Sequence, residues 1–165
     1  MKLRSCDVEV LRLHLSYEPE TGVIRWVVPT ARAIKAGQRA GRLTDEGYRL
    51  VRLLGVDYFA HRIAWALMHG SWPSLIIDHK NGGRDDNRSC NIREVSLAMN
   101  QQNRTRAQAG SKTGFIGVQA RPNGTFQAKI RNEGRRIALG TYATPEEAHG
   151  AYIVAKSKMH PGYVA

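Results

Sequence analysis

Two strands joined by a long polar loop and followed by a short helix are predicted in the middle of the chain, and this order constrains the fold more than any other feature. The first strand, Ser74–Asp78, is short and mostly apolar, and it ends next to His79, where a buried strand becomes an exposed loop. Asn91–Ser96 can be the returning strand. The segment Ser96–Arg104 then predicts a short helix capped by its first serine.

The side chains around this loop have the chemistry that phosphodiester hydrolysis requires. The reaction needs a base that deprotonates water, neutralisation of the phosphate charge and stabilisation of the leaving oxygen. A neutral His79 can take the proton near pH 7. A hard divalent cation can serve the other two needs, and Asp78 and Asn100 offer the oxygen ligands that it prefers. Asn91 can lock His79 by a hydrogen bond to its backbone or its ring.

Charge and cysteine content restrict the partners. The formal net charge of +11 and the pI of about 10.2 favour a polyanion, and nucleic acid is the commonest one. We find no run of about 18 apolar residues, so we expect no membrane partner. Cys6 and Cys90 form no C-x-x-C pair, and we expect two reduced thiols in a reducing cytoplasm.

The first third of the chain alternates turn signals with short apolar runs. Gly22–Val28 and Gly47–Leu53 are typical of strands, whereas Val8–Leu15 fits a helix or a strand equally well. A helix follows, for which Asp57 is the expected N-cap and Gly70 the expected C-terminal glycine.

From Phe115 onward the pattern predicts three strands and a helix. The runs FIGVQA, TFQAKIR and RRIALG are separated by Pro122-Asn123-Gly124 and Asn132-Glu133-Gly134, which are typical of hairpin turns. Thr144 opens a capping box with proline at the first helical position. Alternation gives the sheet an apolar face, which the helix covers through Ala148, Tyr152, Ala155 and Met159. The other face carries Gln127, Lys129, Arg131 and Arg136.

The middle of the chain resembles the HNH endonuclease family, in particular its homing-type members from phages and introns. The resemblance rests on HRIAWALMHG-x-WP, IDHKNG, DDNRSCNIRE and NQQN, and it covers about Tyr17 to Asn103. It implies a ββα-metal fold in which His79 is the general base, Asn91 orients it and Asp78 binds the metal. The third family position is often His, whereas this chain offers Asn100 as the second metal ligand.

The same residues also have a structural interpretation. A histidine at a strand end is more often packed than catalytic, and Asn81-Gly82-Gly83 is typical of a turn. The combination at family spacing, with the high positive charge, favours the nuclease. Other residues of the motif are expected to have supporting roles. His61 is expected to pack or to reach DNA phosphate, Asn87 and Arg88 to brace the loop or contact the DNA backbone, and Asn103 to cap the helix or contact phosphate.

Residues Gly114 to about His160 resemble the AP2 DNA-binding domain, a three-stranded sheet on one helix that lies in the major groove. By resemblance, Arg121 and Arg131 contact DNA, and strand alternation adds Gln127, Lys129 and Arg136. The chain departs from the plant pattern at Gln119, where an arginine is usual, and at Asn123, where a tryptophan is usual. The target sequence therefore does not carry over.

Together these patterns predict an α+β chain with a nuclease domain over residues 1–104, a linker over 105–113 and an AP2-like domain over 114–165. The expected function is metal-dependent hydrolysis of double-stranded DNA, with Mg²⁺ as the metal and Mn²⁺ able to replace it. We expect a monomer or weak dimer, no small-molecule cofactor, and action in the cytoplasm of a bacterium or a phage-infected host. The alternative is a non-catalytic DNA-binding regulator with a degenerate nuclease fold, which Asn100 favours.

Overall fold

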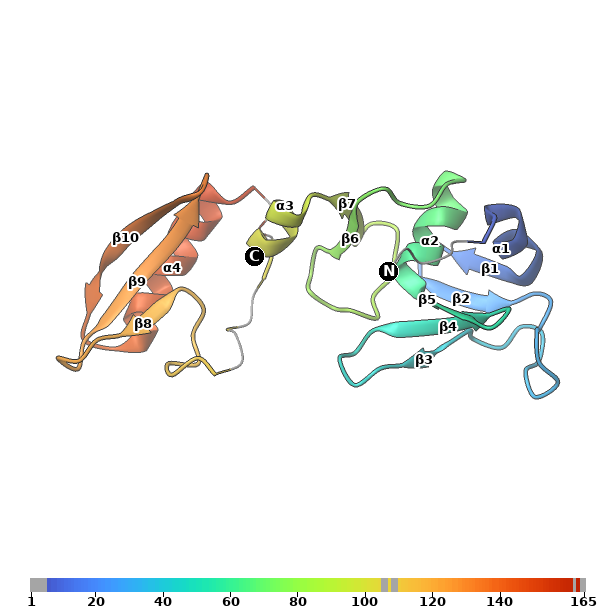
Figure 1. Cartoon of the computed structure of the whole chain (residues 1–165), viewed down its shortest axis with the longest axis horizontal. Coiled ribbons are helices and arrows are strands. Elements are labelled where there is room, and N and C mark those ends of the chain that lie inside the picture. The colour runs from blue at the N-terminus through green and yellow to red at the C-terminus, as the bar shows by residue number, and fades with distance from the viewer. Residues whose placement is uncertain (1–5, 105–106, 108–109, 162, 164–165) are drawn as a thin grey trace. The chain divides into compact units, whose positions relative to one another are not determined.

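The chain forms two compact units, Met1–Leu97 and Ala98–Ala165, in a computed structural model that describes residues 6–104, 107, 110–161 and 163 (Figure 1). Antiparallel sheets and helices occur in both units, which confirms the predicted α+β class. The units divide inside the helix that follows the polar loop, whereas the predicted nuclease domain runs to residue 104. That domain limit stays a prediction, and residues 105, 106, 108 and 109 of the predicted linker lie outside the described part of the chain.

The first unit contains three small antiparallel sheets and two helices, and the polar loop joins the two strands of the last sheet. The sheets pair β1 with β2, β3 with β4 and β5, and β6 with β7. The elements in chain order are α1 (Val8–His14), β1 (Leu15–Glu18), β2 (Val23–Trp26), β3 (Arg42–Leu43), β4 (Arg49–Leu53), β5 (Val56–Phe59), α2 (Ala60–His69), β6 (Ile76–His79), β7 (Ile92–Val95) and α3 (Leu97–Gln102), the last of which enters the second unit. The predicted strand, loop, strand and helix are therefore present as β6, β7 and α3.

The segment with an ambiguous pattern near the N-terminus forms both structures in turn. Val8–His14 is helical, and the Asp7 side chain caps it by accepting a hydrogen bond from the Glu9 amide at 3.1 Å. The chain becomes extended at Leu15, which is buried and begins β1. Helix α1 buries Leu11 in the same core, so the helix and the strand share one apolar cluster.

The predicted start of α2 at Asp57 is wrong. Asp57 lies on β5, where it pairs with Arg52 of β4 and forms an ion pair with it at 3.6 Å. Cross-strand pairing keeps the chain extended as far as Phe59, and the helix begins only at Ala60. The predicted end is confirmed, because Gly70 has the left-handed φ of 71° that ends a helix without a Cβ clash.

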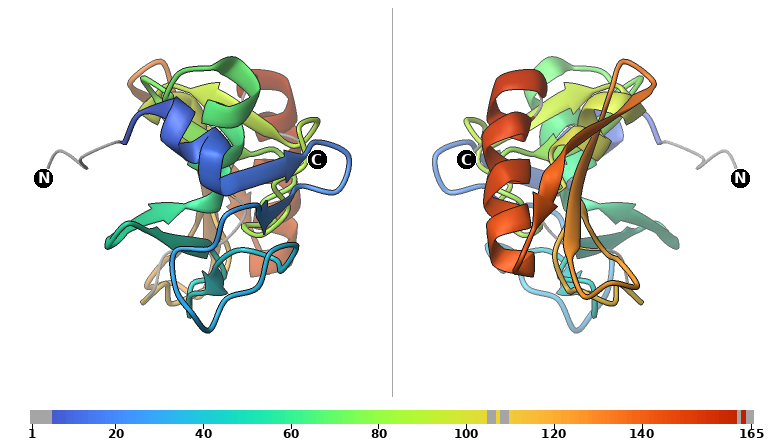
Figure 2. Two further views of the ribbon diagram at one scale, coloured as in Figure 1. Left: turned by 90° about the vertical axis from the view of Figure 1, so that its right-hand side faces the viewer. Right: turned by 90° about the vertical axis from the view of Figure 1, so that its left-hand side faces the viewer.

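The second unit is a three-stranded sheet in the order β10, β9, β8 with one helix on it. Its elements are β8 (Val118–Ala120), β9 (Phe126–Asn132), β10 (Arg135–Tyr142) and α4 (Pro145–Met159). The right-hand view of Figure 2 shows α4 running along one face of the strands β9 and β10. This arrangement agrees with the sheet and helix expected from the sequence.

Local signals set the boundaries of this sheet and helix. Glu133 and Gly134 both have positive φ, 48° and 80°, as a two-residue hairpin turn between twisted strands requires. Thr144 and Glu147 exchange side-chain to backbone hydrogen bonds, so the predicted capping box is confirmed. The buried contact between sheet and helix joins Ile130 to Tyr152 and Ala155.

Within the described residues, none of the helices has the length and apolar character needed to cross a membrane.

Candidate functional site

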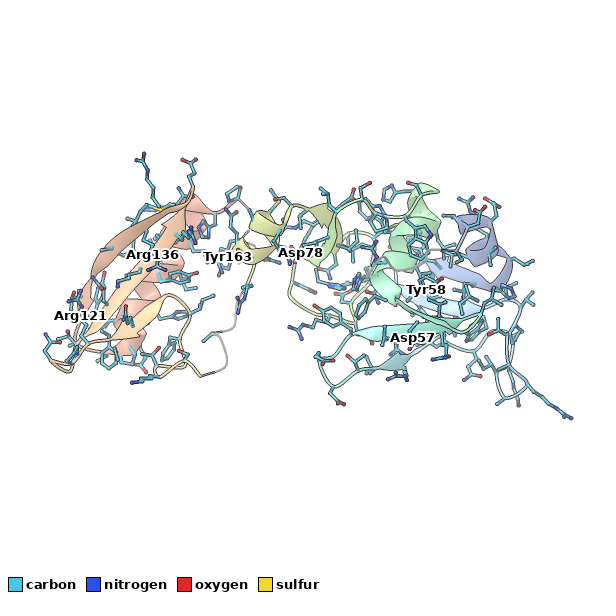
Figure 3. All side chains as sticks on the ribbon, viewed as in Figure 1. Asp57, Tyr58, Asp78, Arg121, Arg136 and Tyr163 are labelled. Atoms are coloured by element: carbon cyan, nitrogen blue, oxygen red, sulfur yellow. The ribbon has the colours of Figure 1, made fainter. Side chains whose placement is uncertain are left out.

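Strands β6 and β7 place Asp78 and His79 on opposite faces of a two-stranded ribbon. Asp78 pairs with Arg93, and His79 pairs with Ile92, so the two adjacent side chains point in opposite directions. Both are buried, with 7% of Asp78 and 5% of His79 exposed. Asp78 is labelled on this ribbon in Figure 3. The site therefore has a carboxylate side and an imidazole side.

On the carboxylate side, Asp78 is held by an arginine from the neighbouring strand. Arg93 donates from Nε and Nη2 to the same oxygen, Asp78 Oδ2, at 3.1 and 2.9 Å. The pair is largely shielded from water, which strengthens the attraction between the two charges. Asp78 is thus fixed in orientation, with the charge of its carboxylate balanced by Arg93.

On the imidazole side, His79 is held by Asn87 from the polar loop. His79 Nε2 lies 3.0 Å from Asn87 Oδ1. An amide oxygen only accepts hydrogen bonds, so Nε2 carries a proton, and in the neutral ring Nδ1 carries the lone pair. The Asn87 side chain faces Asp85 O through Nδ2 at 3.5 Å, which agrees with this amide orientation. Asn87 is 1% exposed, so its geometry is set by the protein.

Aromatic rings form a wall around His79. The His61 ring meets the His79 ring edge to face, with centroids 5.2 Å apart and planes at 89°. The Phe59 ring stacks on the His61 ring, with centroids 5.3 Å apart. The Tyr48 ring lies beside His79, with centroids 6.3 Å apart. Arg84, from the polar loop, lies over the Tyr48 ring at 4.8 Å. The wall restricts how the His79 ring can turn.

Burial lowers the pKa of His61 to about 3, and the nearby charges of His79 and Arg62 lower it further in the same direction. His61 is therefore neutral near pH 7 and does not exchange protons with His79 there. The expectation that His61 packs, and does not act as a second acid or base, agrees with its place in the ring cluster.

Asn91 holds the loop and not the His79 ring. Its Oδ1 accepts from the Asn81 amide at 3.0 Å, its Nδ2 donates to Asp86 O at 2.7 Å, and its backbone oxygen accepts from the Lys80 amide at 2.9 Å. These bonds fix the two residues that directly follow His79. A contact to the His79 ring, one of the two contacts expected from Asn91, is made by Asn87, which the sequence could not distinguish from the other loop asparagines.

Ion pairs fasten the polar loop at two further places. Arg49 of β4 donates to both oxygens of Asp85 at 2.8 and 3.0 Å, and Arg39 adds a third contact at 3.1 Å. Within the loop, Arg88 binds Asp86 through two hydrogen bonds, which lower the pKa of Asp86 to about 2. Arg88 therefore braces the loop, and the loop stays charged and paired at neutral pH.

The chemistry of the metal site can be judged from its donors. Within the described residues, no group of three or more His, Cys, Asp or Glu side chains gathers as a metal cage. Mg²⁺ needs only one or two protein oxygens, because waters and substrate phosphates complete its shell. The Asp78 carboxylate and the amide of Asn100, which lies partly buried on α3, are hard oxygen donors of this kind. Asp78 lies in the first unit and Asn100 in the second, and their joint role as metal ligands stays a prediction.

The outer face of the second unit presents the residues expected to bind DNA. Arg131 of β9 lies directly opposite Arg136 of β10, and both are exposed. Lys129 donates from Nζ to Gln119 Oε1 of β8 at 2.8 Å, and Gln127 pairs with the same residue across the strands. Figure 3 labels Arg136 on β10 and Arg121 beside the turn between β8 and β9.

This face is not neutralised by the protein itself. No ion pair involves a residue of the described part of the second unit. Like charges directly opposite one another across two strands destabilise a sheet, by about 0.2–1 kcal/mol for such pairs. Arg131 and Arg136 stand in that arrangement, which a polyanion on the sheet would relieve.

Part of the chain matches a nuclease family. Residues 58–102 match the family described as HNH endonuclease, and they include Asp78, His79, Asn91 and Asn100. This match confirms the predicted resemblance to HNH endonucleases, a class of phosphodiester hydrolases, over that segment. A solved structure, described as DNA binding and cleavage by the HNH homing endonuclease I-HmuI, has a TM-score of 0.45 and 19% identity, covering 93% of this chain and 85% of that chain.

Two plant proteins from Arabidopsis thaliana are also similar to the chain. The ethylene-responsive transcription factor ERF117 is 45% identical over 69 residues, which are 41% of this chain and 21% of that protein. The ethylene-responsive transcription factor RAP2-11 is 47% identical over 45 residues, 26% of this chain and 18% of that protein. The chain spans about a fifth of these relatives, which partly support the AP2-like resemblance.

Proposed function

We propose that the chain is a metal-dependent endonuclease that hydrolyses phosphodiester bonds of double-stranded DNA, with His79 as its general base. The observation that carries this proposal is the hydrogen bond from His79 Nε2 to Asn87 Oδ1 at 3.0 Å. It assigns the lone pair to Nδ1 and holds the ring in one orientation. A positioned histidine with a defined tautomer is what general-base catalysis requires.

In the proposed reaction, His79 Nδ1 takes the proton of the attacking water, and the positive charge that develops spreads over the ring. Asn87 Oδ1 accepts from Nε2 throughout and favours that cation. His61 stays neutral, so it adds no repelling charge to the imidazolium. Asp78 and Asn100 would hold Mg²⁺, or Mn²⁺ in its place, which supplies charge neutralisation at the phosphate and stabilisation of the leaving oxygen.

DNA binding is assigned to the basic outer face of the second unit. A sheet fits the major groove, where arginine reads guanine edges and lysine holds phosphate. The unrelieved pair Arg131 and Arg136 supports this part of the proposal. The full set of proposed contacts is Arg121, Gln127, Lys129, Arg131 and Arg136.

The number of strands cut depends on how many active sites act together. One catalytic histidine per chain makes a single-strand nick the product of a monomer, and a weak dimer would be needed for a concerted double break. Cys6 and Cys90 are both free thiols, which suits the reducing cytoplasm of a bacterium or a phage-infected cell.

A second candidate, a DNA-binding protein without cleavage activity, is favoured by one observation. Arg93 already pairs with Asp78, and a cation at this carboxylate has to compete with or adjust to that guanidinium. The chain would then bind DNA through the second unit alone.

Cleavage of supercoiled plasmid by the full chain separates the two candidates. With Mg²⁺ or Mn²⁺ we expect open-circle DNA, and with EDTA we expect none, while gel-shift binding persists in both conditions. Binding without cleavage under every divalent metal tested would support the second candidate.

A further inference from the structure

We propose that Tyr17 is a positioning residue for the base, because it holds the loop residue that orients His79. The inference rests on the proposed function. Tyr17 lies on β1, outside residues 58–102 that match the nuclease family. Its role would make the N-terminal hairpin, β1 with β2, a working part of the active site and not only a structural addition.

The first observation is a hydrogen bond between segments far apart in the chain. The Tyr17 hydroxyl donates to the backbone oxygen of Asn87 at 2.8 Å. Burial raises the pKa of Tyr17 to about 12, and the charges of Cys90 and Asp86 add to this effect. The hydroxyl therefore keeps its proton across the working range and donates at every pH of interest.

The second observation is close packing of the hairpin turn on the same peptide. Gly22 has a φ of 73°, and a Cβ built on it would lie 2.5 Å from Arg88 N and 2.6 Å from the carbonyl carbon of Asn87. Only glycine allows so close an approach. Pro19 of the same turn accepts a hydrogen bond from the Ser89 amide at 3.0 Å. The hairpin thus contacts three consecutive loop residues, Asn87, Arg88 and Ser89.

These contacts act on catalysis through the hydrogen bond between His79 Nε2 and Asn87 Oδ1. Asn87 meets His79 with its side chain and Tyr17 with its backbone, so a shift of its backbone moves Oδ1 away from Nε2. A small displacement of a catalytic group lowers the rate strongly, by up to about a hundredfold for 1 Å. The effect falls on the chemical step, because the Tyr17 hydroxyl bonds the residue that holds the His79 ring.

The test compares Tyr17→Phe with Tyr142→Phe. Both remove one hydroxyl that donates to a backbone oxygen, since the Tyr142 hydroxyl bonds Leu139 O at 3.2 Å in the second unit. In single-turnover cleavage of plasmid with Mg²⁺, we expect Tyr17→Phe to lower the rate constant about tenfold or more. DNA affinity should be unchanged, and Tyr142→Phe should cleave at close to the wild-type rate.

A second measurement reads the His79 ring directly. The ¹⁵N chemical shifts of its two ring nitrogens report which one is protonated. We expect a defined Nε2-H tautomer in the wild type and a mixture in Tyr17→Phe, with Gly22→Ala giving the same mixture by pushing on the loop from the turn. Tyr142→Phe should keep the wild-type shifts.

The cleavage assay and the ¹⁵N measurement together distinguish failure of the role of Tyr17 from failure of the proposed function. Equal cleavage rates for the two tyrosine variants, or a change in DNA affinity alone, would overturn the role of Tyr17 while leaving the nuclease intact. If the wild type does not cleave, the proposed function fails, and the ¹⁵N shifts still decide: an unchanged His79 tautomer in Tyr17→Phe and Gly22→Ala overturns the inference.

Discussion

His79 Nε2 and Asn87 Oδ1 lie 3.0 Å apart in the interior of the first unit, and this contact decides which ring nitrogen of His79 is basic. The two residues are 5% and 1% exposed, so bulk water does not compete for the bond. In the proposed reaction, this contact leaves Nδ1 ready to accept a proton before any substrate arrives. Such preparation is the part of general-base catalysis that a fold can supply.

Substitution of Asn87 tests this contact. Asn87→Ala removes the acceptor and leaves a buried ring N–H without its partner, which lowers the free energy of unfolding by about 1–3 kcal/mol. We expect its cleavage rate to fall by up to about a hundredfold as the ring loses its fixed orientation. Urea unfolding followed by tryptophan fluorescence reports the first unit alone, because Trp26, Trp65 and Trp72 all lie in it.

Asn87→Asp serves as the matched variant, because it keeps the shape and the acceptor and adds a negative charge. The carboxylate favours the imidazolium, so the rise of the cleavage rate with pH should begin at higher pH than in the wild type. An unchanged pH profile would show that residue 87 does not act on the base.

The buried His61 makes the first unit sensitive to acid. Its pKa is about 3 in the folded protein and 6.5 as the ordinary value, so between these pH values the unfolded chain binds a proton that the folded chain does not. Stability is therefore full above pH 6.5 and falls as the pH drops toward 3. At pH 5 we expect a loss of about 2 kcal/mol from this residue. In His61→Phe, which keeps a ring, the difference in unfolding free energy between pH 7 and pH 5 should shrink by that amount.

The buried Lys156 makes stability rise with pH in the same way, but at alkaline pH. It is 1% exposed, it bonds Arg104 O and lies 4.3 Å from the Tyr163 ring, and burial lowers its pKa to about 8. Between pH 8 and its ordinary value of 10.5, the unfolded state binds the proton and the folded state does not, so stability rises with pH in that window. Thermal unfolding followed by circular dichroism should show the second unit gaining stability from pH 7.5 to 9.5. Lys156→Met should lack this gain, and an equal gain in both proteins would contradict the assignment.

Arg136 tests the DNA-binding face. Arg136→Ala removes one charge that faces Arg131, so the free protein should become slightly more stable, by about 0.2–1 kcal/mol. DNA affinity should fall, and a lost phosphate contact would lower the slope of log affinity against log salt by about 1. Arg135→Ala is the control, since adjacent strand residues point to opposite faces. Equal effects of the two substitutions would mean that net charge, and not the outer face, governs binding.

The sequence predicted the regular elements well wherever a local signal was strong. The capping box at Thr144, the turn at Glu133-Gly134 and the end of α2 at Gly70 were all confirmed, because each depends on a few neighbouring residues. The start of α2 was missed. Asp57 has the side chain of an N-cap, but pairing of β5 with β4 overrode that local preference.

The partners within the site were harder to predict, because they depend on contacts between distant segments. Asp78 and His79 were placed at the end of a strand as expected, but the choice between Asn87 and Asn91 depends on how the loop folds back. Nor does any local pattern join Tyr17 to Asn87, which are 70 positions apart. The place of Asn87 among the charged loop residues Asp85, Asp86 and Arg88 is a sequence signal that could have drawn attention to it.

Single-turnover cleavage of supercoiled plasmid by His79→Ala, with Mg²⁺, tests whether His79 is the general base. The control is His69→Ala, an exposed histidine at the end of α2. We expect His79→Ala to lose cleavage by about a hundredfold or more while it binds DNA in a gel shift as the wild type does, and His69→Ala to cleave normally. Cleavage by His79→Ala at the wild-type rate would contradict the assignment of His79 as the base.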